Sequence, residues 1–192
     1  MKASGYLYKP FYIQDVYFDY LIGKGSEPFI RANKEAAVFL VYSGQLVISY
    51  KNEKILIKKG EYGFVNRDVI VSLKRKNCEG EQFCCVFMSF GEKCLLDFYN
   101  NLDESAFPFT SSRFNQCIIK LPYSPYLQSL YISLKPYLDW GIKPCADILR
   151  LKRIEGIYSL LLTDSRFYPC LFDFIYMQDI ISQPVNVKFY RN

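Results

Sequence analysis

A series of short apolar segments separated by glycine turns, early in the chain, constrains the fold most strongly. An apolar run over residues 37–42 precedes Gly44, a second run over 45–50 alternates apolar and polar residues, and a third over 54–58 precedes Gly60. Short strands punctuated by glycine turns are typical of antiparallel meanders. The pattern therefore predicts an antiparallel β-barrel in this part of the 192-residue chain.

The absence of histidine from the whole sequence restricts the chemistry that such a barrel could perform. Without imidazole the usual metal site of catalytic barrels cannot form, and neither can a serine or cysteine triad of the usual kind. Glu61 and Asp68 flank a predicted strand, but both lie beside turns, where acids are mostly solvated. We therefore expect neither cofactor nor metal, and a sensor or scaffold rather than an enzyme.

Positive charge is concentrated in one segment of the chain. Residues 51–76 hold eight basic and three acidic residues, and this difference of 8 − 3 = 5 equals the net charge of +5 for the whole chain. The lysines alternate with Ile55, Ile57, Val71 and Leu73, as on a strand with one wet face. A solvated face is the simpler interpretation, and an anion or nucleic-acid patch is the alternative.

Seven cysteines occur without any Cys-x-x-Cys pair, which fits neither a zinc finger nor a disulfide framework. Buried free thiols in a reducing cytosol are the expected state, and a redox switch is the alternative. The first residues lack the apolar run of a secretory signal, and no later apolar run approaches membrane-spanning length. We expect a cytoplasmic protein without a membrane partner.

The remaining elements are predicted from hydrophobic periodicity. Two strands, 37–42 and 83–90, are apolar at both parities, which indicates burial on both faces and a cover outside the barrel. Helical spacing of apolar residues supplies the cover. The other predicted elements are strands at 11–22 and 117–121, helices at 92–102, 124–140 and 146–162, and a short aromatic turn of helix at 167–174.

The order of these elements resembles the N-terminal regulatory half of bacterial AraC-type transcription regulators. Residues 41–46 and 59–65 are similar to the family's glycine-punctuated strands, whereas 149–162 and 171–174 are similar to its last regulatory helix and the Leu-Phe-Asp-Phe element after it. The resemblance covers residues 36–182. It implies an α+β fold, in which an antiparallel, cupin-like (jelly-roll) β-barrel is followed by an antiparallel helical pair.

The resemblance also implies a division of the chain. We expect a barrel with one covering helix over 1–110, a helical dimerisation and packing subdomain over 111–176, and a linker over 177–192. In the family a pair of helix-turn-helix units follows such a linker, and the sequence ends before it. Contact with DNA is therefore expected only through a domain that this sequence lacks, whether the sequence is an excised domain or a natural protein without a DNA reader.

Strand parity gives candidate site residues. They form either a hydrophobic core or a pocket, and a pocket would suit an apolar or planar ligand or a sugar ring. Tyr50 or Tyr62 would offer a hydroxyl to such a ligand. The candidate residues are Phe39, Val41, Ile48, Tyr50, Ile57, Tyr62, Phe64 and Val71. In the helical pair, one stripe either seals the barrel or forms a homodimer contact, and the resemblance implies a dimer contact in this region. The stripe consists of Leu151, Ile154, Tyr158 and Leu161.

These observations lead to one functional hypothesis and two rivals. The first is an effector-sensing and dimerisation domain of an AraC-type regulator, with a small-molecule effector or a protein regulator as partner. A cupin-fold sugar isomerase or metal-dependent enzyme would need polar groups converging inside the barrel. A purely protein-binding module would instead have a barrel filled by its own side chains.

Overall fold

The computed structural model describes residues 11–13, 16–23, 28–76, 78, 83–103, 112–139 and 144–173. The strands of the first half are β1 (Phe11–Ile13), β2 (Val16–Gly23), β3 (Phe29–Asn33), β4 (Ala36–Ser43), β5 (Gln45–Tyr50) and β6 (Glu53–Lys58). The elements that follow are β7 (Tyr62–Val65), β8 (Val69–Lys76), β9 (Phe83–Phe90), α1 (Glu92–Tyr99), β10 (Ile118–Lys120), α2 (Pro125–Asp139) and α3 (Ala146–Thr163). Residues 167–173 form a further short helix.

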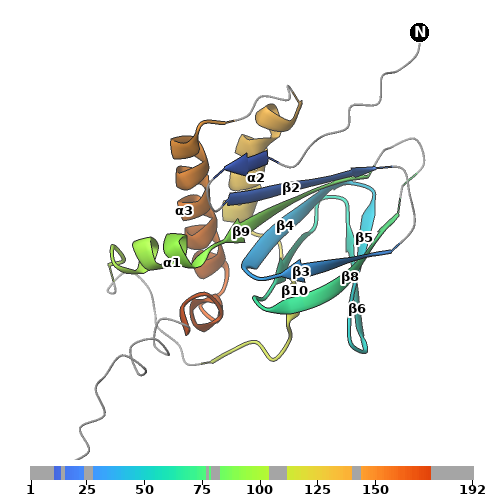
Figure 1. Ribbon diagram of the computed structural model, residues 1–192, viewed down its shortest axis with the longest axis horizontal. Helices are drawn as coiled ribbons and strands as arrows, with labels where there is room; N and C mark the ends of the chain where they lie inside the picture. Colours follow the sequence, from blue (N-terminus) through green and yellow to red (C-terminus); the bar gives the residue numbers. More distant parts are fainter. Residues whose placement is uncertain are drawn as a thin grey trace, which may run out of the picture.

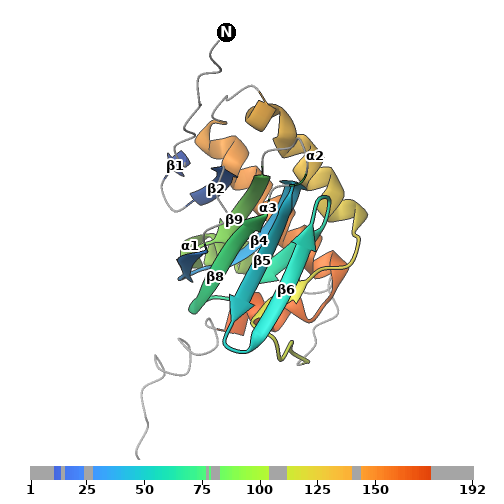
Figure 2. The same ribbon diagram turned by 90° about the vertical axis from the view of Figure 1, so that its right-hand side faces the viewer.

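The strands form two antiparallel sheets that face each other. A six-stranded sheet has the order β1-β2-β9-β4-β7-β10, and a four-stranded sheet has the order β3-β8-β5-β6. Every strand pair in both sheets is antiparallel. Helices α2 and α3 lie against the six-stranded sheet, on the side away from the four-stranded one (Figures 1 and 2). The predicted α+β class with antiparallel sheets is confirmed.

Glycine turns connect the meander as the sequence predicts. Gly44, between β4 and β5, and Gly60, between β6 and β7, have φ angles of 76° and 80°. Backbone of this hand is costly for residues with a Cβ atom, so glycine fits both turns. A Cβ atom at Gly44 would also lie 2.7 Å from the carbonyl oxygen of Lys76.

The six-stranded sheet is apolar on both faces, and each face borders its own hydrophobic cluster. Alternate residues of β4 show this: Phe39 and Val41 point to the other sheet, whereas Val38 and Leu40 point to the helices. In β9, Phe87 and Met88 divide in the same way. The prediction that both strands are buried on two faces is confirmed, and the covering elements are α1, α2, α3 and the helix at 167–173.

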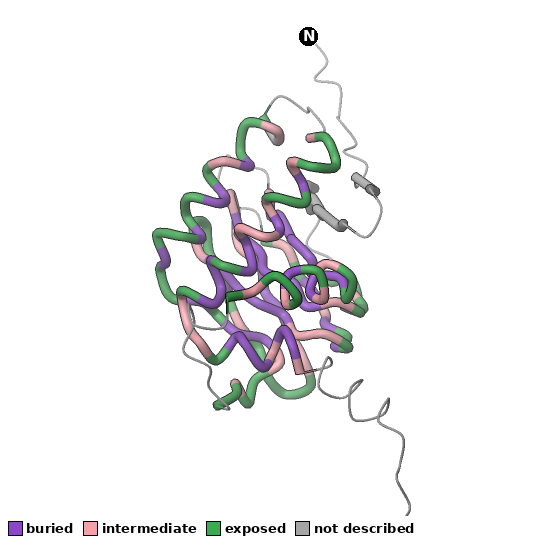
Figure 3. Tube along the Cα trace, turned by 90° about the vertical axis from the view of Figure 1, so that its left-hand side faces the viewer, coloured by how far each residue is buried: buried purple, intermediate pink, exposed green. Residues whose placement is uncertain are grey.

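The helices begin and end close to their predicted positions. Helix α2 starts at Pro125, whose missing N–H is tolerated in the first turn, and its predicted stripe of Leu127, Leu130, Tyr131 and Leu134 is buried. The side chain of Leu138, the last residue of that stripe, lies outside the described residues. Exposed residues follow the outer sides of the helices, and buried residues lie beneath them (Figure 3).

Candidate functional site

The space between the two sheets brings together most of the predicted pocket residues. Five of them belong to one buried cluster there: Phe39, Val41, Ile48, Ile57 and Val71. Tyr50 packs against this cluster and remains partly exposed. Strand parity therefore identified the inner face of four strands, while ligand binding by these residues remains a proposal.

Tyr62 and Phe64 do not lie between the sheets, so their predicted placement in the barrel interior was wrong. Both point to the helices and belong to the cluster that α2, α3 and the helix at 167–173 cover. The Phe64 ring packs edge-on against Phe167, with 4.9 Å between ring centroids. All four residues of β7 are buried, so hydrophobicity gave no indication of which parity faces inward.

The inward position of β7 is occupied by Gly63, and an aromatic ring fills the space beside it. A Cβ atom at Gly63 would lie 2.2 Å from the Phe39 ring. That ring stacks on Phe87, with centroids 4.7 Å apart and an interplanar angle of 27°. The stack joins β4 to β9 in the middle of the interior, where Phe39 and Phe87 are fully buried.

Two arginines on the inner face of the four-stranded sheet were missed by the sequence analysis. The Arg31 guanidinium lies 4.5 Å from the centroid of the Phe87 ring, and its Nε donates a 2.9 Å hydrogen bond to Asn33 Oδ1. The Arg75 guanidinium lies 5.3 Å from the Phe29 ring, and its buried Nε has no hydrogen-bond acceptor among the described residues. Such contacts place cationic groups over aromatic faces at the edge of the apolar interior.

A signal for Arg75 was present in the sequence. Val69, Val71 and Leu73 are buried at every second position of β8, and Arg75 continues that parity. Counting Arg75 with its neighbours Lys74 and Lys76 as part of one wet face hid this alternation.

On the helical side, Gly156 sets a close approach between α3 and the central strand β9. A Cβ atom at Gly156 would lie 2.7 Å from Met88 Sδ and 3.3 Å from the Phe90 ring. Met88 and Phe90 occupy the same strand as Phe87, which faces the opposite side of the sheet. Helix α3 therefore rests on the strand whose other face borders the interior.

Tyr131 of α2 carries a buried hydroxyl that finds no partner in the part of the chain that the structure describes. Its ring lies between Tyr42 and Tyr62, with centroid distances of 6.3 and 5.7 Å, and the Tyr42 hydroxyl donates a 2.6 Å hydrogen bond to the Tyr131 carbonyl oxygen. The Tyr131 hydroxyl itself has no hydrogen-bond partner among the described residues. Burial raises the pKa of Tyr131 well above its ordinary value, so the phenol stays protonated at neutral pH.

The four predicted dimer residues lie along one side of α3, but their burial differs. Leu161 is 5% exposed and belongs to the internal core, and Ile154 packs against that core. Leu151 is exposed, and Tyr158 is partly so while packing on Phe98 at 4.8 Å between ring centroids. The stripe therefore lies at the border between the exposed side of α3 and its buried face, which also carries Arg153 and Gly156. A dimer contact through this stripe stays a prediction.

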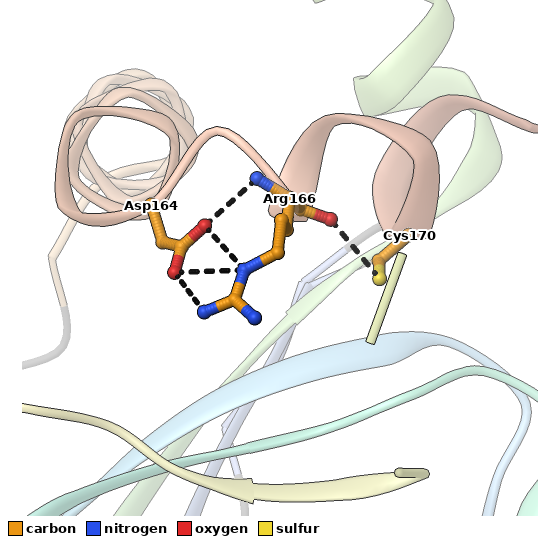
Figure 4. A network of polar contacts seen from close by, with 3 residues as sticks. All are labelled: Asp164, Arg166 and Cys170. Carbon is orange, nitrogen blue, oxygen red and sulfur yellow. Dashed lines mark hydrogen bonds and ion pairs between the residues drawn. The ribbon is translucent and has the colours of Figure 1, made fainter. Parts of the chain in front are cut away.

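The helix at 167–173 is fixed to the rest of the fold by polar and aromatic contacts. Asp164 accepts 2.9 Å and 3.0 Å hydrogen bonds from the Arg166 backbone N–H and Nε, and the Cys170 thiol donates to the Arg166 carbonyl oxygen at 3.4 Å (Figure 4). The Arg166 side chain lowers the pKa of Asp164, which keeps the carboxylate ionised at the start of this helix. Phe167 is completely buried, so the helix is anchored on its apolar side as well.

The structure holds all seven cysteines as free thiols, but their burial varies. Cys85 is buried, whereas Cys78 and Cys145 are exposed, which corrects the expectation that the thiols are buried. Burial, with a smaller contribution from Asp139, raises the pKa of Cys84 to about 11. Among the described residues, no group of three or more Cys, Asp or Glu side chains is placed to hold a metal ion.

The two facing sheets enclose an apolar interior, and helices cover the other face of the six-stranded sheet. The family described as "ExsA N-terminal regulatory domain" matches residues 36–168. The chain belongs to this family of regulatory domains of AraC-type transcription regulators. Comparison with curated proteins by sequence finds no significant match.

Three solved structures are similar to this chain to different degrees. Apo ToxT K231A from Vibrio cholerae has a TM-score of 0.56 at 10% identity, and the match covers 84% of this chain and 65% of that one. A cupin superfamily protein from Desulfitobacterium hafniense DCB-2 has a TM-score of 0.39 at 16% identity, covering 47% of this chain and 83% of that one. The ethanolamine utilization protein EutQ from Salmonella typhimurium LT2 has a TM-score of 0.35 at 10% identity, covering 40% and 58%.

The chain thus spans less than two thirds of the ToxT and EutQ chains. Because the ToxT likeness is at 10% identity, it shows the fold alone. The other two likenesses have TM-scores below 0.5 and carry no argument. None of the helices in the described part of the chain is long and apolar enough to cross a membrane.

Proposed function

We propose that this domain receives a signal at its β-sheets and relays it through α3 to a dimer contact and to an attached DNA-binding part. The family supports the regulatory role. The observation that supports the relay is the position of β9. Phe87 of this strand lies in the cluster between the sheets, and Met88 lies beside Gly156 of α3. A shift of β9 on one side must move side chains on the other, so a ligand that prefers one arrangement changes its population.

For an effector between the sheets, we propose an anion with an apolar body. Arg31 and Arg75 supply positive charge beside Phe29 and Phe87, and Arg75 has no carboxylate partner among the described residues. An aromatic or aliphatic carboxylate would pair with a guanidinium while its apolar part contacts the rings. A purely apolar interior would admit sugars, fatty acids and aromatic compounds. The two arginines favour those among them that carry a carboxylate.

A thermal-shift screen tests the effector proposal. At saturating concentration, a binding carboxylate is expected to raise Tm by about 2 °C or more, because it binds the folded state only. The matching alcohol or amide should raise it less. In Arg75→Met the carboxylate should lose most of its effect, whereas Lys93→Met, on α1, should keep it.

Equal shifts for the carboxylate and its neutral analogue would contradict the role of Arg75. If no sugar, fatty acid or aromatic compound raises Tm, the result would favour the protein-binding module instead. The close stack of Phe39 on Phe87 beside Gly63 is the observation that favours that second candidate, since these groups fill part of the interior themselves.

We propose a homodimer contact on the outer side of the helical pair. Leu151 is 54% exposed and Ile132 of α2 is 61% exposed, and large aliphatic side chains exposed on neighbouring helices are typical of interfaces. Tyr158 and Leu162 add partly exposed apolar surface to α3. Leu161 is excluded from this proposal because the internal core already buries it.

The dimer prediction concerns Leu151. We expect Leu151→Arg to weaken dimerisation about tenfold or more in sedimentation analysis, because a charge would be buried at the contact. Ile70→Arg is the matched control, since Ile70 is 64% exposed on the four-stranded sheet and should leave the dimer unchanged. An unchanged dimer in Leu151→Arg, or equal weakening in both variants, would contradict the proposed contact.

We propose that the barrel (1–110) and the helical part (111–176) work as one unit in the cytoplasm. Strand β10 comes from the second part and pairs with β7 of the first, with Ile118 opposite Val65. Residues 177–192 lie outside the described residues, and we propose that they link to the DNA-binding part.

A further inference from the structure

The outer face of the four-stranded sheet is a flat surface that no described helix covers. Strands β8, β5 and β6 lie in front in Figure 2, with the helices behind them. Residues of alternate parity point outward, and the pairing register places them in rows across the sheet. The outward set comprises Ile30, Ala32, Gln45, Val47, Ser49, Lys54, Leu56, Lys58, Ile70, Ser72, Lys74 and Lys76.

Four lysines give this face a positive charge, and no acid is among the outward residues of β3, β5, β6 and β8 that the structure describes. Lys58 and Lys76 both pair with Gln45 and flank it in one row. Lys74 lies in the next row beside Val47, and Lys54 lies in the row after that. All four are exposed, and none forms an ion pair with a carboxylate among the described residues.

Some lysines elsewhere in the fold form ion pairs. Lys120 forms a 2.8 Å ion pair with Glu61, and Lys152 forms one of the same length with Glu155. Neighbouring like charges on strands repel each other. These four lysines have no carboxylate partner among the described residues, so the group adds a repulsion that an acidic partner would relieve.

Aliphatic side chains are exposed on the same face. Ile30 is 77% exposed and Ile70 is 64% exposed, and the register makes them diagonal neighbours on β3 and β8. Leu56, on β6 between Lys54 and Lys58, is 37% exposed and lies opposite Val47. The face thus has an aliphatic end at Ile30 and Ile70, and a cationic end where Leu56 is exposed and Val47 beside it is buried.

We propose that this face binds an acidic polypeptide segment that also carries aliphatic side chains. Acidic groups on such a segment match the lysines, and its aliphatic groups would bury Ile30, Ile70 and Leu56. Nucleic acid fits less well, because single strands are bound through aromatic stacking, and no aromatic or arginine side chain points outward here. A membrane fits less well because Ser49 and Ser72 in the middle of the face would lose their hydrogen bonds to water in hydrocarbon.

The chain's own C-terminal segment is a poor occupant. Residues 174–192 contain one acidic residue, Asp179, against Lys188 and Arg191. The partner is therefore expected to be another polypeptide. This inference concerns a surface separate from both the interior and the helical pair, so it does not depend on the function proposed above.

A labelled peptide of about 12 residues, in which glutamate and leucine or valine alternate, is a suitable probe. We expect it to bind the chain in fluorescence anisotropy and to bind less when NaCl is raised from about 50 mM to about 300 mM. A peptide with lysine in place of glutamate should not bind. A peptide with serine in place of the aliphatic residues should bind more weakly.

Variants of the protein locate the binding surface. The double variant Lys58→Glu with Lys76→Glu is expected to weaken peptide binding about tenfold or more, because attraction becomes repulsion. Ile70→Ser should also weaken it. Lys93→Glu, an exposed lysine on α1, should leave binding unchanged, and circular dichroism should show that all variants are folded.

Several results would overturn the proposal. They are failure of the acidic peptide to bind, equal weakening by Lys93→Glu, or full binding by the peptide that lacks aliphatic residues. Tighter binding of duplex DNA or of phosphatidylserine vesicles at this face, lost in the same double variant, would assign the surface to nucleic acid or to a membrane instead.

Discussion

Replacing Gly63 with alanine is expected to lower the free energy of unfolding by about 3 kcal/mol or more. The new Cβ atom would lie 2.2 Å from the Phe39 ring, far inside van der Waals contact. Phe39 cannot move away easily, since it is fully buried and stacks on Phe87 at 4.7 Å. Denaturant unfolding measured by circular dichroism would give the loss.

A double-mutant cycle provides the control. Phe39→Leu removes part of the ring and should be destabilising by itself, but it leaves room for a methyl group at Gly63. The double variant should therefore be more stable than the sum of the two single losses predicts, with an interaction energy of about 1 kcal/mol or more. Additive losses would show that Gly63 and Phe39 are not in direct conflict.

Replacing Phe64 with alanine should cost about 3–5 kcal/mol, because a fully buried ring leaves a cavity. The ring lies beneath the helices, edge-on to Phe167. Beyond the global loss, we therefore expect faster amide hydrogen exchange in residues 167–173. Equilibrium unfolding gives the first quantity, and hydrogen-exchange mass spectrometry gives the second.

Phe83→Ala is the matched control for this prediction. Phe83 is also fully buried, but it lies between the sheets rather than beneath the helices. It should cause a comparable global loss without selective exposure of residues 167–173. Equal exchange in the two variants would mean that Phe64 does not hold the last helix in place.

Most of the architecture could be predicted because local signals and tertiary structure agree. The glycine turns at Gly44 and Gly60, the proline that starts α2, and the two-faced apolar pattern of β9 each have a direct physical cause in the chain itself. Strand β10, at Ile118–Lys120, and the helix at 167–173 also lie within their predicted ranges. The family resemblance added the expectation that the strands form a barrel and that a helical pair follows it.

The errors occurred where burial does not follow hydrophobicity. Strand β7 is buried on both faces, so the sequence could not reveal that Gly63 rather than Phe64 points inward. In α3, Gly156 is buried because the backbone approaches β9, and this contact depends on Met88, which is distant in sequence. Arg31 was missed because no strand was predicted at Phe29–Asn33, where it lies opposite the inward-facing Val71.

The six-stranded sheet separates two hydrophobic clusters. This arrangement determines which part of the chain can fold when its gene segment is separated from the rest. A gene fragment that encoded only the strands would leave Val38, Leu40, Val86 and Met88 uncovered, and such a product would tend to aggregate. Recombination between regulators would therefore preserve the strands and their helices together. Transfer of the sheets alone to a new protein would require that protein to supply an apolar cover of matching shape.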